Sequence, residues 1–292
     1  MRLVFIHGRA QGKRTPAELE AEWGAAIDQG FANAGKERPA DLQIVLPFYG
    51  ARLDALTANA QTKLARIIER GDPGTEPAVD PFALDLLLAI ARGAGIGDSE
   101  MSAELPAGVL QRGPESWEWV QAVGRLIDRR LPWFAEFTVA RFTADVHAYV
   151  TRKAVRTAIH ELLRPALVVD EPSVVVAHSL GTVVAYWLLN ELGDEVQVPL
   201  FVTLGSPLGI EVIKDRLPRP LGMPQGVARW VNAADERDPI ALHSRLERPR
   251  FPADIENISD LQNPHDHPHG IKGYLADPKV ASRIHDALTV LS

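Results

Sequence analysis

The sequence of 292 residues contains no cysteine. Disulfide bonds, cysteine nucleophiles and cysteine-ligated zinc sites are therefore excluded, and covalent catalysis would need a hydroxyl, an amine or a carboxylate. Basic residues are fewer than acidic ones: the sequence has 31 Lys and Arg and 38 Asp and Glu, which gives a net charge of −7. A chain with this balance produces no broad positive field, so we expect no nucleic-acid partner.

Long hydrophobic runs are missing as well. The longest run, from Pro81 to Ala91, is interrupted by Asp85 and is shorter than the roughly 20 apolar residues that cross a bilayer. The first residues, MRLVFIHG, are too few for the hydrophobic part of a signal peptide. We therefore expect no integral membrane segment and, by default, a cytoplasmic location. Hydrophobic residues at 46% and charged residues at 24% indicate a compact globular protein.

Short apolar runs of β-type residues alternate with helical patterns along most of the chain. The expected strands are residues 3–6, 42–46, 174–176, 198–204, 227–232 and 255–258. Helices are expected over 15–30, over 139–163 and from 277 onward. This alternation predicts an α/β fold in which a mostly parallel sheet is flanked by helices.

Residues 51–140 interrupt this alternation. They contain the Pro- and Gly-rich stretch GDPGTEPAVDP, an apolar helical segment and the aromatic-rich ESWEWVQAVGRLIDRRLPWFAEF, but no strand pattern. We predict a helical insertion, or cap, over a core made of residues 1–50 and 141–292. Its aromatic residues either wall an apolar pocket or pack between helices in the ordinary way. They are Trp117, Trp119, Trp133, Phe134 and Phe137.

Residues 173–189, SVVVAHSLGTVVAYWLL, have the order apolar strand, tight turn, helix. Such a turn holds Ser179 in a strained backbone conformation and exposes its hydroxyl above the carboxyl edge of the sheet. Ala177 and Gly181, two residues away on either side, are small, as a close crossing of strand and helix requires. The first N–H groups of the helix would face a developing oxyanion. The alternative is a serine that only caps a buried helix.

The sequence AHSLG resembles the G-x-S-x-G nucleophile elbow of the α/β-hydrolase superfamily, with Ala177 in place of the first glycine. The resemblance extends to His7-Gly8 after the first strand and to GSPLG, which is similar to lipase-like and esterase-like members. It covers residues 1–50 and 165–292 and leaves the insertion unmatched. The superfamily implies a sheet of about six strands and a nucleophile at Ser179.

The same resemblance implies an oxyanion hole. Its first donor would be the backbone N–H of Leu180, directly after the nucleophile. Its second donor would be the backbone N–H of Arg9, with Ala10 as the neighbouring candidate. Gly8 would let the chain turn toward the site.

A serine nucleophile needs a base within hydrogen-bonding reach and a carboxylate that orients the base. In the superfamily, the acid and then the histidine follow the serine along the chain. Asp238, in Asp-Pro-Ile, fits the acid best, and Asp235 is the second candidate; either could instead form an Asx-turn. His269, which precedes Tyr274, fits the base best, and His267 is the second candidate.

A metal site is the competing interpretation of this loop. His265, Asp266, His267 and His269 are all ligand types, but their spacing is irregular. We expect neither a metal nor a cofactor. His178 is expected to line the cleft without taking part in proton transfer.

The sequence therefore predicts a serine hydrolase that cleaves a carboxylic ester through an acyl-enzyme at Ser179. The substrate would be a small-molecule ester or another acyl compound. Amide or peptide cleavage on the same triad and a non-catalytic binding protein of the hydrolase fold are the alternatives.

Overall fold

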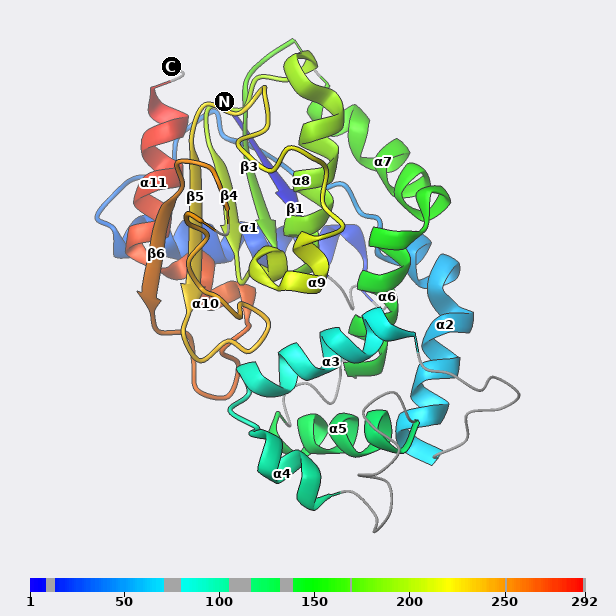
Figure 1. The fold of residues 1–292 in the computed structure, drawn as a ribbon. Coiled ribbons are helices and arrows are strands. Elements are labelled where there is room, and N and C mark those ends of the chain that lie inside the picture. The colour runs from blue at the N-terminus through cyan, green and yellow to red at the C-terminus, as the bar shows by residue number, and fades with distance from the viewer. Residues whose placement is uncertain are drawn as a thin grey trace.

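The computed structural model describes residues 1–8, 14–70, 80–104, 117–131, 139–168, 170–249 and 251–290. Within them, six parallel strands form one sheet in the order β2-β1-β3-β4-β5-β6 (Figure 1). The strands are β1 (Arg2–Ile6), β2 (Gln43–Val45), β3 (Ser173–His178), β4 (Phe201–Leu204), β5 (Trp230–Asp235) and β6 (Glu256–Leu261). The predicted α/β class and the parallel sheet of about six strands are confirmed.

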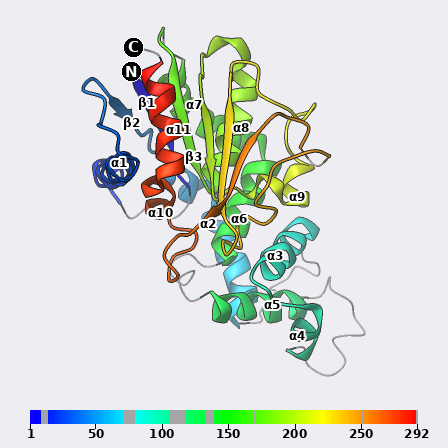
Figure 2. The same ribbon diagram turned by 90° about the vertical axis from the view of Figure 1, so that its left-hand side faces the viewer.

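Helices cover both faces of the sheet. The described helices are α1 (Pro16–Asn33), α2 (Gly50–Arg70), α3 (Pro81–Gly93), α4 (Asp98–Ala103), α5 (Trp117–Arg130), α6 (Val139–Thr151), α7 (Lys153–Leu167), α8 (Leu180–Leu192), α9 (Glu211–Lys214), α10 (Ile271–Ala276) and α11 (Pro278–Thr289). Figure 2 shows α1, α10 and α11 on one face, with α7 and α8 on the other. Among the residues described, no helix combines the length and apolar character needed to cross a bilayer.

The central strand β3 lies between two hydrophobic cores. Val174 and Val176 belong to the core that includes residues of α1 and α11, whereas Val175 and Ala177 belong to the core that includes residues of α8 and the insertion. Every residue of β3 is buried. A strand buried on both faces is continuously apolar, which explains the run of valines in the sequence.

Two helices begin where the sequence predicts them to begin. The Thr15 side chain accepts a hydrogen bond from the backbone N–H of Glu18, whose carboxylate accepts one from the Thr15 N–H, so the predicted capping box forms. Asp277 caps α11 by accepting from the N–H of Lys279. Pro278 then occupies the first turn of α11, where its missing N–H costs nothing.

The prediction of one long helix over residues 139–163 is wrong. The chain leaves the helical conformation at Arg152, which has φ −105° and ψ 104°, and α6 and α7 lie on either side of it. Arg156 donates hydrogen bonds of 3.0 Å to the carbonyls of Tyr149 and Val150, near the end of α6. These bonds satisfy carbonyls that a helix end leaves without partners. The second helix also continues past Pro165 to Leu167.

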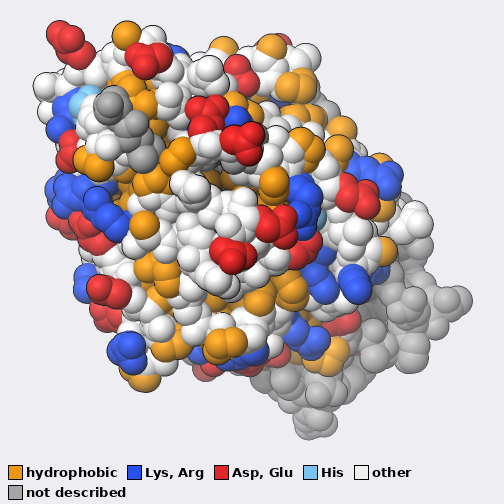
Figure 3. Space-filling model, turned by 90° about the horizontal axis from the view of Figure 1, so that it is seen from above, with side chains coloured by type: hydrophobic (Ala, Val, Ile, Leu, Met, Phe, Trp, Pro, Cys, Tyr) orange, Lys and Arg blue, Asp and Glu red, His pale blue; other side chains and the backbone are white. Residues whose placement is uncertain are grey.

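Helices α3, α4 and α5 of the insertion lie beyond the carboxyl ends of the strands, where the arrowheads point in Figure 1. Helix α3 touches the loop after β5, because a Cβ added at Gly93 would lie 2.7 Å from the carbonyl oxygen of Pro239. Trp119 is partly buried against the hydrophobic core. Trp133, Phe134 and Phe137 lie outside the described residues. The opposite face, at the amino ends of the strands, carries acidic and basic side chains side by side (Figure 3).

We predict that Gly181→Ala lowers the free energy of unfolding by about 2 kcal/mol, since the new Cβ would overlap the backbone of β1. A Cβ at this position would lie 2.3 Å from the carbonyl oxygen of Ile6. Gly24→Ala is the matched control, because its Cβ would meet only Ile44 at an ordinary 3.5 Å. It should instead raise stability by up to about 1 kcal/mol through helix propensity. Urea unfolding measures both, and equal effects would contradict the proposed close crossing.

Candidate active site

Ser179 occupies a sharp turn between β3 and α8. Its backbone has φ 56° and ψ −132°, a conformation that residues with a side chain seldom adopt. The Ser179 N–H donates to the carbonyl of Leu204 at 3.0 Å, which ties the turn to β4. A Cβ added at Gly8 would lie 2.9 Å from the Cβ of Ser179. The end of β1 therefore passes directly beside the serine, and only glycine fits there.

Three buried polar residues form a continuous hydrogen-bonded chain. Ser179 Oγ lies 2.8 Å from His269 Nε2, and His269 Nδ1 lies 2.7 Å from Asp238 Oδ2. A carboxylate can only accept, so the ring carries its proton on Nδ1 and leaves Nε2 free to accept from the serine hydroxyl. The structure thus brings together the serine, acid and base that the sequence predicts, in the order that nucleophilic catalysis requires.

Asp235, the second candidate for the acid, has a different set of partners. Its Oδ1 accepts from the backbone N–H of Arg237 at 2.8 Å and from Arg237 Nε at 3.0 Å. Its Oδ2 accepts from the guanidinium of Arg237 and from the N–H of Asn263 at 2.7 Å. Burial alone raises the pKa of Asp235, but these hydrogen bonds outweigh it and leave the pKa below its usual value. Asp235 therefore ties β5 to the segment after β6 and does not reach the serine.

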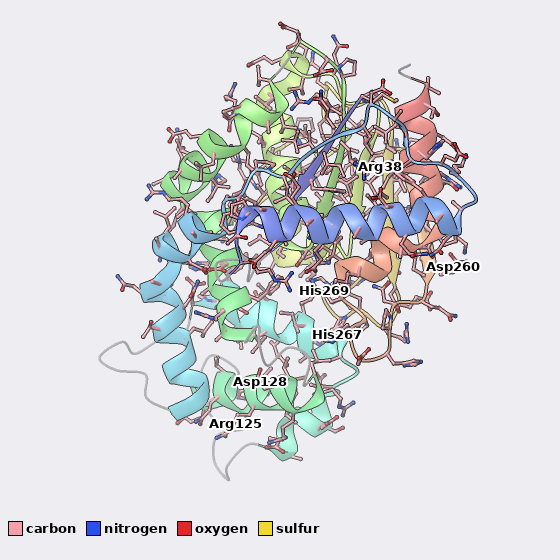
Figure 4. The ribbon with its side chains drawn as sticks, turned by 180° about the vertical axis from the view of Figure 1, so that it is seen from behind. Arg38, Arg125, Asp128, Asp260, His267 and His269 are labelled. Carbon is pink, nitrogen blue, oxygen red and sulfur yellow. The ribbon has the colours of Figure 1, made fainter. Side chains whose placement is uncertain are left out.

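The loop histidines lie in different surroundings. His269 is buried, while 65% of the His267 side chain is exposed. Figure 4 places His269 between α1 and the helices of the insertion, and His267 farther along the loop. His265 Nδ1 lies 3.1 Å from the guanidinium of Arg237. In the described part of the chain, no three His, Cys, Asp or Glu side chains gather in a geometry that could hold a metal ion.

Gly205 packs against the Asp–His pair. It directly follows β4 and has φ 54°. A Cβ added there would lie 2.9 Å from Asp238 Oδ2 and 3.1 Å from His269 Nδ1. GSPLG served only as a point of resemblance, and no role was expected for this glycine. The sequence did contain a signal for such a role, because the glycine directly follows the strand next to the one that carries the serine.

His178 lies beside His269 and contacts its backbone. Its Nε2 lies 2.9 Å from the backbone carbonyl oxygen of His269. Burial holds the pKa of His178 well below its usual value, and the neighbouring His269 lowers it further. The neutral ring then carries its proton on Nε2 and donates it to the His269 carbonyl. This contact gives His178 a structural partner within the site, which the sequence alone did not show.

The start of α8 and the end of β1 lie beside the serine. Leu180 is the first residue of α8, and the first N–H groups of a helix have no partner within it. The dipole of this helix also favours negative charge at its start. The other predicted donor, Arg9, and its neighbour Ala10 lie outside the described residues.

His7 and Tyr49 hold the end of β1 in place. The His7 ring accepts at Nε2 from the Tyr49 N–H at 3.1 Å and donates from Nδ1 to the Gly8 carbonyl at 2.7 Å. The Tyr49 hydroxyl donates to the backbone carbonyl of His7, and the two rings stack with centroids 4.1 Å apart. Burial lowers the pKa of His7 to about 4, although the hydrogen bond to Gly8 favours the protonated ring.

Comparisons with protein-family models, with curated proteins and with solved structures found no match. The geometry of the site places a serine hydroxyl against a histidine ring, a carboxylate on the other nitrogen of that ring, and the start of a helix beside the serine.

We predict that His7 makes stability fall as the pH is lowered from about 6.5 to about 4, because its pKa is lower in the folded state than in the unfolded chain. The unfolded chain then binds more protons over this range, which costs the folded state about 3 kcal/mol by pH 4. His7→Asn keeps a donor near Gly8 but does not titrate. Urea unfolding at several pH values should give a shallower pH dependence for this variant than for the wild type. Equal slopes would contradict the assignment.

Proposed function

We propose that the protein is a serine hydrolase of the α/β-hydrolase type that cleaves carboxylic esters through an acyl-enzyme at Ser179. The single observation that carries the proposal is the hydrogen-bonded chain from Ser179 through His269 to Asp238. Its support is the strained turn that holds the serine beside a helix start. A serine that merely capped α8 would need neither the histidine nor the carboxylate.

Acylation begins when the Ser179 oxygen attacks the ester carbonyl carbon. His269 Nε2 takes the hydroxyl proton as the new C–O bond forms, and the carbonyl π electrons move to the oxygen. The imidazolium is stabilised by the Asp238 carboxylate at Nδ1. His269 then returns the proton to the departing alkoxide, so an alcohol leaves and the acyl group stays on the serine.

Deacylation repeats the same steps with water in place of the serine. His269 Nε2 removes a proton from water, the hydroxide adds to the acyl carbon, and Ser179 leaves with the proton returned by the histidine. In both steps the tetrahedral oxyanion would accept a hydrogen bond from the Leu180 N–H. One such donor is worth about 3 kcal/mol of transition-state stabilisation.

We predict that the purified protein hydrolyses short-chain p-nitrophenyl esters and that a fluorophosphonate attaches covalently at Ser179. Ser179→Ala should abolish labelling and lower kcat by about a million-fold, because the nucleophile and its proton are lost. Intact-mass spectrometry and peptide mapping measure the labelling.

A peptide panel run beside the ester panel tests the bond that is cleaved. Hydrolysis of amides with rates comparable to esters would replace the proposed substrate class. Labelling that persists in Ser179→Ala, or a wild-type protein that neither labels nor hydrolyses, would contradict the proposal.

Asp238→Asn and Asp235→Asn form a matched pair, since each replaces a buried carboxylate near the end of β5 by an amide. Asp238→Asn should slow fluorophosphonate labelling by about ten thousand-fold, because the amide favours the wrong tautomer of His269. Asp235→Asn should reduce labelling by no more than about tenfold and should mainly lower stability, by about 2 kcal/mol. The reverse order of labelling rates would assign the acid to Asp235.

A further inference from the structure

Asp238, the proposed acid of the site, has a buried neighbour that does not belong to the triad. Tyr274 lies on α10 and is fully buried. Its hydroxyl donates to Asp238 Oδ2 at 2.8 Å and accepts from the backbone N–H of Asp235 at 3.1 Å. Both partners are close to the end of β5, so the hydroxyl bridges the strand end to the carboxylate.

The direction of the Tyr274–Asp238 hydrogen bond follows from its two partners. The backbone N–H of Asp235 can only donate, so it occupies a lone pair of the hydroxyl oxygen. The hydroxyl proton is then left for the Asp238 carboxylate, which can only accept. Burial and the adjacent Asp238 carboxylate raise the pKa of Tyr274 well above its usual value, so the donor keeps its proton.

The Asp238 carboxylate is thereby held at both oxygens. Oδ2 accepts from Tyr274 and from His269 Nδ1, the latter at 2.7 Å. Oδ1 accepts from the N–H of Ile240 at 2.9 Å, and the N–H of Ala241 lies 3.4 Å away. Tyr274 and His269 bond to the same carboxylate oxygen of Asp238. The hydrogen bond from the Tyr274 hydroxyl therefore reduces the negative charge that this oxygen presents to the imidazole.

We propose that Tyr274 is a positioning residue for the reaction: its hydroxyl fixes Asp238 Oδ2 against His269 and withdraws part of the carboxylate charge from the imidazole. This inference rests on the proposed function for its catalytic meaning. The effect of the Tyr274 hydroxyl on proton uptake by His269 can, however, be measured without any substrate.

The other titratable groups packed around the pair come from β3 and from the end of β5. The His178 ring centroid lies 4.7 Å from that of His269, and Arg237 pairs with Asp235 beside the tyrosine. His178 is held by the His269 carbonyl and Arg237 by the Asp235 carboxylate, so we expect both to stay in place when the Tyr274 hydroxyl is removed and the His269 titration to report on that hydroxyl.

The first test is Tyr274→Phe, with Tyr186→Phe as the matched control. Tyr186 is also a buried tyrosine whose hydroxyl donates one hydrogen bond and accepts another, in its case to the carbonyl and from the N–H of Gly222. The His269 ring is titrated by ¹⁵N NMR in the full-length protein. In Tyr274→Phe the midpoint should rise by about half a pH unit or more, since the full carboxylate charge now stabilises the imidazolium.

The rate of fluorophosphonate labelling below pH 7 should fall roughly tenfold in the same variant. It should fall because more of the base is protonated and the carboxylate has lost one of its anchors. Tyr186→Phe should leave both the midpoint and the labelling rate unchanged.

A second variant keeps the test decisive if Tyr274→Phe does not fold. Incorporation of 3-fluorotyrosine at position 274 preserves shape and strengthens the donor, so the His269 midpoint should move downward. A midpoint that stays at the wild-type value in either folded variant would overturn the inference. Absence of labelling in the wild type would overturn the proposed function alone, because the NMR midpoint is read without turnover.

Discussion

The close crossing of α8 over the ends of β1 and β3 is the constraint on which the site depends. At Gly181 there is no room for a Cβ against the Ile6 and His7 carbonyls, and at Gly8 none against Ser179 itself. This approach forces the serine to φ 56°, a conformation that costs roughly 1–3 kcal/mol. Burial of all of β3 and of most of α8 offsets that cost. The main chain therefore fixes where the serine hydroxyl leaves the sheet.

The parallel sheet assembles the remaining groups at the same edge. Adjacent strands β3, β4 and β5 are followed by Ser179, Gly205 and the loop of Asp238, so three distant parts of the sequence meet there. The segment after β6 then carries His269 back to the serine. Ligands of open parallel sheets bind beyond the carboxyl ends of the strands for the same topological reason.

The sequence predicted the fold class and a mostly parallel sheet of about six strands because buried parallel strands are continuously apolar. It misplaced the start of β4, because Val198 pairs with Val227 in an isolated bridge before the ladder begins at Phe201. The break at Arg152 was invisible because no proline or glycine marks it, and the Arg156 hydrogen bonds that accompany it leave no pattern in the sequence. The choice between Asp235 and Asp238 was open for a related reason: Asp235 is occupied by Asn263, which a different strand brings near. The spacing of residues along the sequence does not show which of the two aspartates has such a partner.

Two buried tyrosines hold groups that surround the serine. Tyr49 donates to the His7 carbonyl at the end of β1, and Tyr274 donates to the Asp238 carboxylate that contacts His269. Burial raises the pKa of both hydroxyls above the usual value, so both keep their protons and remain donors at neutral pH. Both hydrogen bonds form when the protein folds, so the conformational entropy of these side chains is already lost before a substrate binds. Preorganised groups of this kind stabilise a transition state because they need not reorient as charge develops. The rigidity of the site is therefore set by side chains outside the triad as much as by the triad itself.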